Sequence, residues 1–214
     1  MDTNSTSPDL DFRRFFELRD PVAKSALRLE MTDDSATTLD LWELVRQRQR
    51  PVQAIQLHGF MGRSLADFLW CTPVQLICVS ERVLDLLRSH NLTGWGTYPV
   101  EIFDRSGNSV PGYWGLSIYA NAGYMDFKQS RVVTLPPPRP EGKAAQAHIG
   151  FTFDQSRWDG SDIFWVGNAI VVVERVHKLF KRDRVTNVRL TPILEVEQLS
   201  SLVAMIERKQ KKDE

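Results

Sequence analysis

Hydrophobic residues between positions 39 and 50 recur at the spacing of one helix face. The i, i+3, i+4 pattern places three of them on the same side of a helix: Leu41, Leu44 and Val45. Asp40 stands where a carboxylate interacts favourably with a helix N-terminus, and Pro51 predicts the end of the helix. Over 52–57 apolar residues alternate imperfectly with glutamines, which predicts a short strand.

One such pattern occurs twice in the chain. Glu81-Arg82-Val83 recurs 93 positions later as Glu174-Arg175-Val176. Each copy follows a short β-rich run and leads into another extended stretch, and each has an apolar stripe at helical spacing. We therefore predict a duplicated strand–helix–strand unit, over about 74–102 and 169–195, with approximate internal symmetry.

The two copies differ in their expected helix ends. Ser80 is a good N-cap for the first helix, and Gly94 follows a plausible C-terminal turn. Val173 and Asn187 stand at the corresponding positions of the second copy, where they weaken the cap and the turn. The strand–helix–strand interpretation holds for both copies.

The remaining segments complete the predicted organisation. Residues 1–11 are expected to form a flexible lead, 12–18 a first strand or a short helix, and 208–214 a charged tail. The turn composition of 104–108, followed by a strand at 113–119, predicts a β-hairpin. A last apolar stripe predicts a C-terminal helix through Leu199, Leu202, Val203 and Ile206.

The proline-rich segment 135–142 is expected to be an extended connector between two halves, because proline lacks an amide donor and fixes φ. A groove-binding role is the alternative. Together these elements predict an α+β fold, with a mixed or mainly antiparallel sheet and flanking helices, in a single domain over 12–207.

The composition argues against nucleic acid and membranes as partners. The chain has 214 residues, 42% of them hydrophobic, which is enough for a substantial core. Its 27 basic and 27 acidic side chains balance, so net charge gives no attraction to nucleic acid or to a membrane. The polar start of the chain and the absence of a long apolar run lead us to expect a soluble, cytoplasmic protein.

Cys71 and Cys78 lie on a segment that is expected to be buried. Their spacing places them on opposite faces if the segment is one continuous strand. We expect two reduced core thiols rather than a disulfide or a metal pair.

No motif supports a catalytic centre, a cofactor or a metal. The segments 59–64 and 94–96 lack the spacing of nucleotide-binding loops, and we interpret both as turns. Ser117 lacks one glycine of a nucleophile elbow and is expected to be a strand residue. Each of the four histidines stands alone in the sequence: His58, His90, His148 and His177. We therefore expect a protein that is not an enzyme.

The most concentrated acidic and aromatic segment spans 153–162 and contains Trp158, Asp159 and Asp162. Arg157 falls where a calcium-binding loop needs an oxygen ligand. Turn-forming aspartate and glycine explain the segment as well as acid–base chemistry does. Aromatic rings in loops beside aspartates also suit the anchor positions of a protein interface.

The order of several short motifs resembles a known family. The motifs are Asp67-Phe68, Val79-Ser80-Glu81-Arg82, Thr93-Gly94, Tyr98-Pro99-Val100, Tyr113-Trp114-Gly115-Leu116, Met125 to Ser130, and Asp159 to Phe164. Over about 67–195 the chain is similar to bacterial immunity proteins of polymorphic-toxin systems, of the type numbered immunity family eleven and formerly filed as a domain of unknown function.

The resemblance implies a cytoplasmic protein that binds a cognate toxin, such as a nuclease, and blocks its active site one to one. The residues expected to contact the toxin are Tyr124, Asp126, Asp154, Trp158, Asp159 and Asp162. An enzyme that reverses a toxin-made modification, and a scaffold that uses the proline-rich segment, remain alternatives.

Overall fold

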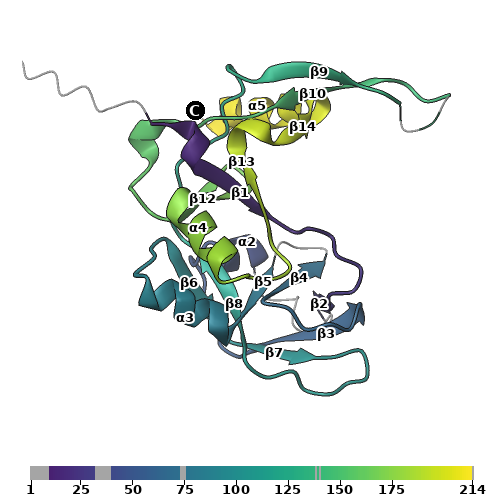
Figure 1. The fold of residues 1–214 in the computed structure, drawn as a ribbon, viewed down its shortest axis with the longest axis vertical. Helices are drawn as coiled ribbons and strands as arrows, with labels where there is room; N and C mark the ends of the chain where they lie inside the picture. Colours follow the sequence, from purple (N-terminus) through teal and green to yellow (C-terminus); the bar gives the residue numbers. More distant parts are fainter. Residues whose placement is uncertain (1–9, 32–39, 73–75, 138, 140, 214) are drawn as a thin grey trace, which may run out of the picture.

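The protein has an α+β fold built mostly from antiparallel sheets (Figure 1). The computed structural model describes all residues except 1–9, 32–39, 73–75, 138, 140 and 214. Most of the predicted N-terminal lead therefore lies outside the described residues. Helices α3 (Glu81–Ser89) and α4 (Glu174–Arg182) lie on the sheets, and α2 (Leu41–Val45) is shorter.

A seven-stranded sheet forms one end of the molecule, with strand order β6-β8-β5-β4-β2-β3-β7. Its strands are β2 (Arg28–Met31), β3 (Ile55–Met61), β4 (Phe68–Thr72), β5 (Ile77–Ser80), β6 (Trp95–Tyr98), β7 (Val100–Phe103) and β8 (Tyr113–Ile118). Only β2–β4 and β3–β7 pair in parallel. The two edge strands, β6 and β7, are separated in the chain by Pro99 alone. The sheet is therefore curled, and its two edges lie next to each other at Pro99.

A four-stranded antiparallel sheet occupies the middle, in the order β11-β12-β1-β13. Its strands are β1 (Phe15–Arg19), β11 (Ile163–Val166), β12 (Ala169–Val173) and β13 (Arg189–Pro192). Successive residues of a strand point to opposite faces. Accordingly, Ile163 and Trp165 belong to one hydrophobic cluster and Phe164 and Val166 to another. This sheet therefore separates two cores, which explains why every residue of β11 is buried.

A third sheet projects from the body as an arm (Figure 1). It has the order β14-β10-β9, formed by β9 (Arg131–Leu135), β10 (Ala145–Ile149) and β14 (Glu197–Leu199). The C-terminal helix α5 (Ser200–Asp213) packs on it, and Val203 is buried there. Three short 3-10 helices complete the fold: η1 (Phe12–Arg14), η2 (Gln155–Arg157) and η3 (Ile193–Glu195).

The two predicted strand–helix–strand units are both present. Helices α3 and α4 have the same length and begin 93 positions apart. Left-handed backbone recurs at the same offset, in Asn91 (φ 48°) and Arg184 (φ 52°) and again in Gly94 (φ 92°) and Asn187 (φ 57°). Asparagine tolerates this conformation, so replacing the glycine leaves the turn in place.

The caps differ as predicted. Ser80 Oγ accepts a hydrogen bond from the Val83 amide, whereas Val173 provides no side-chain cap. In α3 the buried residues are Val83, Leu84 and Leu87, while Leu86 is only partly buried.

Several predicted elements have other boundaries. The helix expected over 39–50 ends at Val45, although Asp40 caps it as predicted. Strand β3 continues to Met61, so the turn expected over 59–64 begins only at Gly62 (φ 66°). Residues 95 and 96 belong to β6, and only Gly94 of that glycine pair is a turn. In the second copy the extended stretch stops at Pro192 and becomes η3.

The turn expected at 104–108 is present, and Phe103 and Ser109 form an antiparallel bridge across it. The strand expected at 113–119 does not extend this pairing into a longer hairpin. Strand β7 pairs with β3, and β8 pairs with β5 and β6, because the curled sheet brings distant strands to both. The proline-rich segment does not connect two halves. It lies in the chain between β9 and β10, which pair with each other in one sheet.

The two cysteines are free and buried, as predicted. They belong to adjacent antiparallel strands, Cys71 to β4 and Cys78 to β5, rather than to one continuous strand. Burial raises the pKa of the Cys71 thiol to about 12 and raises that of Cys78 as well. Both thiols are therefore protonated and unreactive at neutral pH.

Candidate functional site

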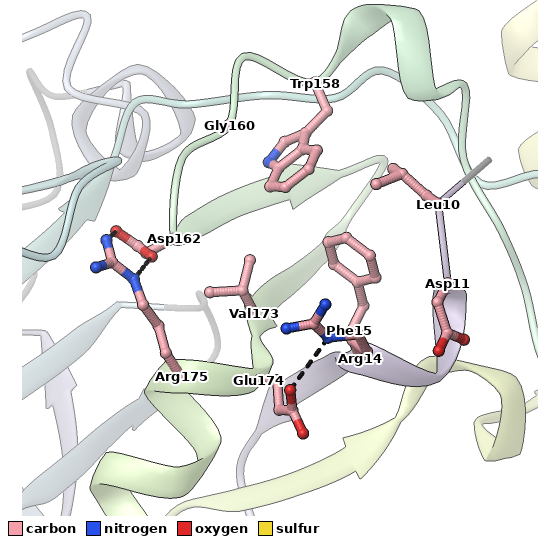
Figure 2. Close-up of a pocket in the computed structure, with 10 residues that line it drawn as sticks. All are labelled: Leu10, Asp11, Arg14, Phe15, Trp158, Gly160, Asp162, Val173, Glu174 and Arg175. Atoms are coloured by element: carbon pink, nitrogen blue, oxygen red, sulfur yellow. Dashed lines mark hydrogen bonds and ion pairs between the residues drawn. The ribbon is translucent and has the colours of Figure 1, made fainter. Parts of the chain in front are cut away.

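A surface pocket of about 340 Å³ opens where η1, the loop before β11 and the start of α4 meet (Figure 2). It is lined by Leu10, Asp11, Arg14, Phe15, Trp158, Gly160, Asp162, Val173, Glu174 and Arg175. Three of these, Trp158, Gly160 and Asp162, come from the acidic and aromatic segment 153–162. We call this the Trp158 pocket.

Trp158 forms a fixed wall of this pocket. Its indole N–H donates to the Ser161 carbonyl oxygen at 3.0 Å, and its ring meets Phe15 edge-on at 5.2 Å. It also packs against Phe164, with ring centroids 5.7 Å apart. These contacts hold the Trp158 side chain on its polar and its apolar side, so it does not rotate outward to insert into a partner protein.

The charges that line the pocket are paired. Arg14 donates to Glu174 at 3.1 Å, and Arg175 donates through two nitrogens to the Asp162 carboxylate. Hydrogen bonds from Lys178 and Arg14 lower the pKa of Glu174. Carboxylates and guanidinium groups thus alternate around the pocket, in place of a uniformly acidic patch.

Asp162 does not fit its predicted role as a contact residue. Its side chain is only 3% exposed, because it points inward to Arg175 and to Thr93. Thr93 donates from its amide at 2.8 Å and from its hydroxyl at 3.0 Å. Burial raises the pKa of Asp162, but these hydrogen bonds outweigh that effect and hold the pKa below its usual value.

Asp154 and Asp159 are both exposed. The Asp154 carboxylate accepts from the Ser156 amide at 2.9 Å and from its hydroxyl at 2.7 Å, which caps η2 and lowers the pKa of Asp154. Asp159 lies between two residues of the pocket wall and accepts from the Ser161 amide at 3.0 Å. Both carboxylates keep solvent-facing surface that a partner can reach.

Tyr124 and Asp126 lie on a neighbouring segment and do not line the Trp158 pocket. The Tyr124 ring is 6.0 Å from the guanidinium of Arg157, which connects this segment to η2. Asp126 and Thr152 exchange backbone hydrogen bonds at 2.8 Å. The Asp126 side chain turns back to the Lys128 amide at 2.9 Å and is partly exposed.

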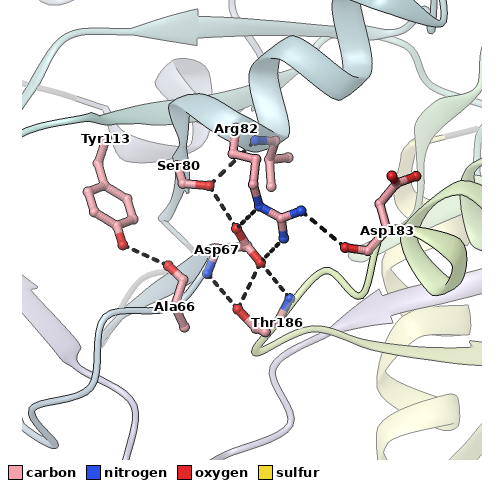
Figure 3. Close-up of polar contacts among 8 residues, drawn as sticks. Ala66, Asp67, Ser80, Arg82, Tyr113, Asp183 and Thr186 are labelled. Atoms are coloured by element: carbon pink, nitrogen blue, oxygen red, sulfur yellow. Dashed lines mark hydrogen bonds and ion pairs between the residues drawn. The ribbon is translucent and has the colours of Figure 1, made fainter.

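A second buried carboxylate was not found by the motif search. Asp67 accepts from Arg82 Nη2 at 2.6 Å, from Ser80 Oγ at 3.0 Å, and from Thr186 (Figure 3). Arg82 also donates to the carbonyl oxygen of Asp183, at the end of α4. These contacts fix the start of α3 against the second copy.

Asp67 and Asp162 occupy matching places in the two copies. Each pairs with the arginine at the second position of the following helix and with the threonine after the helix of the other copy. Backbone bonds follow the same plan, from Phe68 N to Thr186 O and from Ile163 N to Thr93 O. The sequence repeat contains part of this pattern, because Arg82 and Thr93 recur 93 positions later as Arg175 and Thr186. The two aspartates, Asp67 and Asp162, are separated by a different offset.

Several side chains that could carry catalytic or metal chemistry have defined contacts among the described residues. No group of three metal-binding side chains occurs in this part of the chain. Ser117 is a buried strand residue, as predicted. Ser130 Oγ lies 2.7 Å from His148 Nδ1, yet it donates to the Phe127 carbonyl oxygen at 2.6 Å. The Ser130 hydroxyl therefore contacts both the Phe127 carbonyl oxygen and the His148 ring.

The other three histidines also have structural surroundings. His58 stacks on Phe103, with ring centroids 5.0 Å apart, and His177 stacks on Phe16 at 4.1 Å. His90 contacts the Leu86 carbonyl oxygen at 3.0 Å.

Across the described residues, no helix is long and apolar enough to cross a membrane.

Comparison with models of known protein families finds no match, and comparison with curated proteins finds none either.

Proposed function

We propose that this protein is an immunity protein that neutralises a cognate bacterial toxin by stoichiometric binding. The resemblance over about 67–195 supports this proposal. The structural observation that carries it is the Trp158 pocket, a rigid concave site with exposed carboxylates beside it.

The pocket suits a protein partner better than a reacting substrate. Its wall is aromatic and its charged groups are already paired, so it offers shape and apolar surface rather than a free acid or base. Interface energy concentrates where an anchor side chain enters such a pocket and excludes water. We therefore propose that the toxin supplies the anchor residue.

Asp154 and Asp159 would steer association with a basic surface, as in a nuclease whose cleft binds phosphate. Toxin binding at this site would cover the catalytic cleft. Inhibition would then require about one molecule of this protein per toxin molecule.

The direct test measures binding to a candidate toxin domain that co-purifies with this protein. Asp154→Lys/Asp159→Lys should raise the Kd about tenfold or more, mainly through slower association, and the loss should shrink at high salt. Asp85→Lys is the matched control, because Asp85 is an exposed aspartate on α3, 70% exposed and distant in sequence. Equal affinity in both variants would refute the assigned surface.

A second pair of variants tests the pocket itself. Trp158→Phe removes the hydrogen bond from the indole N–H to the Ser161 carbonyl oxygen and makes the aromatic wall of the pocket smaller. It should raise the Kd for the toxin about tenfold, equivalent to about 1.4 kcal/mol. Trp114→Phe changes an exposed ring on β8 and should leave the Kd unchanged. Melting temperatures of both variants separate lost binding from lost folding.

Titration of toxin activity distinguishes the enzymatic alternative. An occluding inhibitor stops inhibiting below one equivalent, whereas an enzyme that repairs a modified target restores activity at far lower ratios. Deleting 136–140 tests the scaffold alternative, which predicts loss of the partner without loss of the fold.

A further inference from the structure

Strand β9 forms an open edge of the projecting arm. In the sheet order β14-β10-β9 it pairs only with β10, over five residues with no register shift. Every second backbone amide and carbonyl of such a strand points away from its neighbour. Val132 is 53% exposed on this strand, so the edge offers both hydrogen-bonding groups and apolar surface.

The other edge strands in the described part of the chain are shorter than β9, with three or four residues each. Strand β14 has three residues and runs directly into α5. Strand β13 ends at Pro192, and β11 forms a bridge through Trp165 to Asn121. The edges β6 and β7 meet at Pro99. Strand β9 has no proline, bulge or inward charge, which are the usual protections of an edge.

The β9–β10 hairpin of the arm has an excess of basic residues in a protein of zero net charge. Between positions 131 and 149 the basic residues are Arg131, Arg139 and Lys143, against the single acid Glu141. A second copy is a poor partner for this edge. Antiparallel pairing of two β9 strands would bring the cationic tip of one arm beside Lys128 and Arg131 of the other.

We propose that β9 binds an extended, acidic peptide segment of another protein by β-strand addition. Main-chain hydrogen bonds to the edge would provide affinity, and the arginine and lysine side chains of the arm would select acidic residues. This surface is distinct from the Trp158 pocket, and the inference does not depend on the immunity function.

The probe is a blocked, fluorescent peptide of sequence Glu-Val-Thr-Val-Thr-Glu. Addition to the full-length protein should slow amide hydrogen exchange within 131–135, and fluorescence anisotropy should report binding. An analogue with N-methylated valines cannot donate hydrogen bonds from those residues and should bind about tenfold more weakly or not at all. A peptide with lysine in place of glutamate should lose affinity by a similar factor.

The protein variant Arg139→Glu/Lys143→Glu should weaken binding of the acidic peptide by about tenfold. Both residues lie at the exposed tip, so folding is unaffected, and Arg63→Glu is the control away from the arm. Equal binding of the three peptides, or protection outside β9, would overturn the proposal. Concentration-dependent protection of β9 without peptide would also overturn it, by identifying a second copy as the occupant.

Discussion

The Asp67 carboxylate accepts two hydrogen bonds from Thr186, one from its amide and one from its hydroxyl, both at 2.8 Å. The two residues are 119 positions apart in the chain. Asp162 makes the same pair of contacts with Thr93. The two copies of the repeated unit therefore hold each other reciprocally, through one buried carboxylate in each direction.

Neutralising either carboxylate should destabilise the fold. Asp67→Asn or Asp162→Asn weakens charge-assisted hydrogen bonds to arginine and threonine and should lower the free energy of unfolding by about 1–3 kcal/mol. The loss stays below that of a fully buried ion pair, because Arg82 and Arg175 are 49% and 57% exposed. Urea denaturation measures this loss in the free energy of unfolding. Asp85→Asn, at a 70% exposed site, should change the value by less than about 0.5 kcal/mol.

The contact between the copies predicts energetic coupling. Thr186→Val removes the hydroxyl that donates to the Asp67 carboxylate and accepts from the Asp67 amide at 2.9 Å. Its effect in an Asp67→Asn background should be smaller than in the native protein, with a coupling of about 0.5–2 kcal/mol. Thr186→Val combined with Asp162→Asn should be additive, since that carboxylate bonds to the other threonine. Additivity of both pairs in a double-mutant cycle would contradict the reciprocal arrangement.

Acid should weaken the same contacts. The pKa values of Asp67 and Asp162 are held below their usual range, so their contribution to stability is complete above about pH 4, the unfolded value. It is lost as the pH falls through the lower folded values. The stability difference between the native protein and Asp67→Asn should therefore shrink below about pH 4 in denaturation curves. A difference that grows with acid would have the wrong sign for this explanation.

Glu17 should behave in the opposite way. It lies in β1 at 6% exposure, where burial raises its pKa although Arg19 lies 3.3 Å away and opposes the shift. Its Oε2 atom has no hydrogen-bond partner. Glu17→Gln should increase stability at pH 7 by about 1 kcal/mol, and the gain should disappear as the pH falls toward about 4.3, where the native carboxyl is protonated. Glu30→Gln, an exposed site on β2, should show no such gain.

Local pattern was sufficient for the repeated helices and their ends. The stripe in α4, the Ser80 cap and the turn at Gly94 depend on residues close in the chain and were predicted. The turn at Asn187, which we expected to be weaker, keeps the same left-handed backbone. The α+β class followed from the same elements. The identity of the toxin-facing residues remains a proposal, although burial removes Asp162 from that set.

The sequence by itself determined the duplicated unit at an offset of 93, because hydrophobic periodicity and helix caps act within a few residues. Only the tertiary structure decided what the units contact. Every residue of β11 is buried because the strand packs between two cores. Hydrogen bonds to Thr186 and Thr93 hold the carboxylates of Asp67 and Asp162 in buried positions. Such outcomes depend on strands that pair across more than a hundred residues, and side-chain spacing along the chain does not encode that distance.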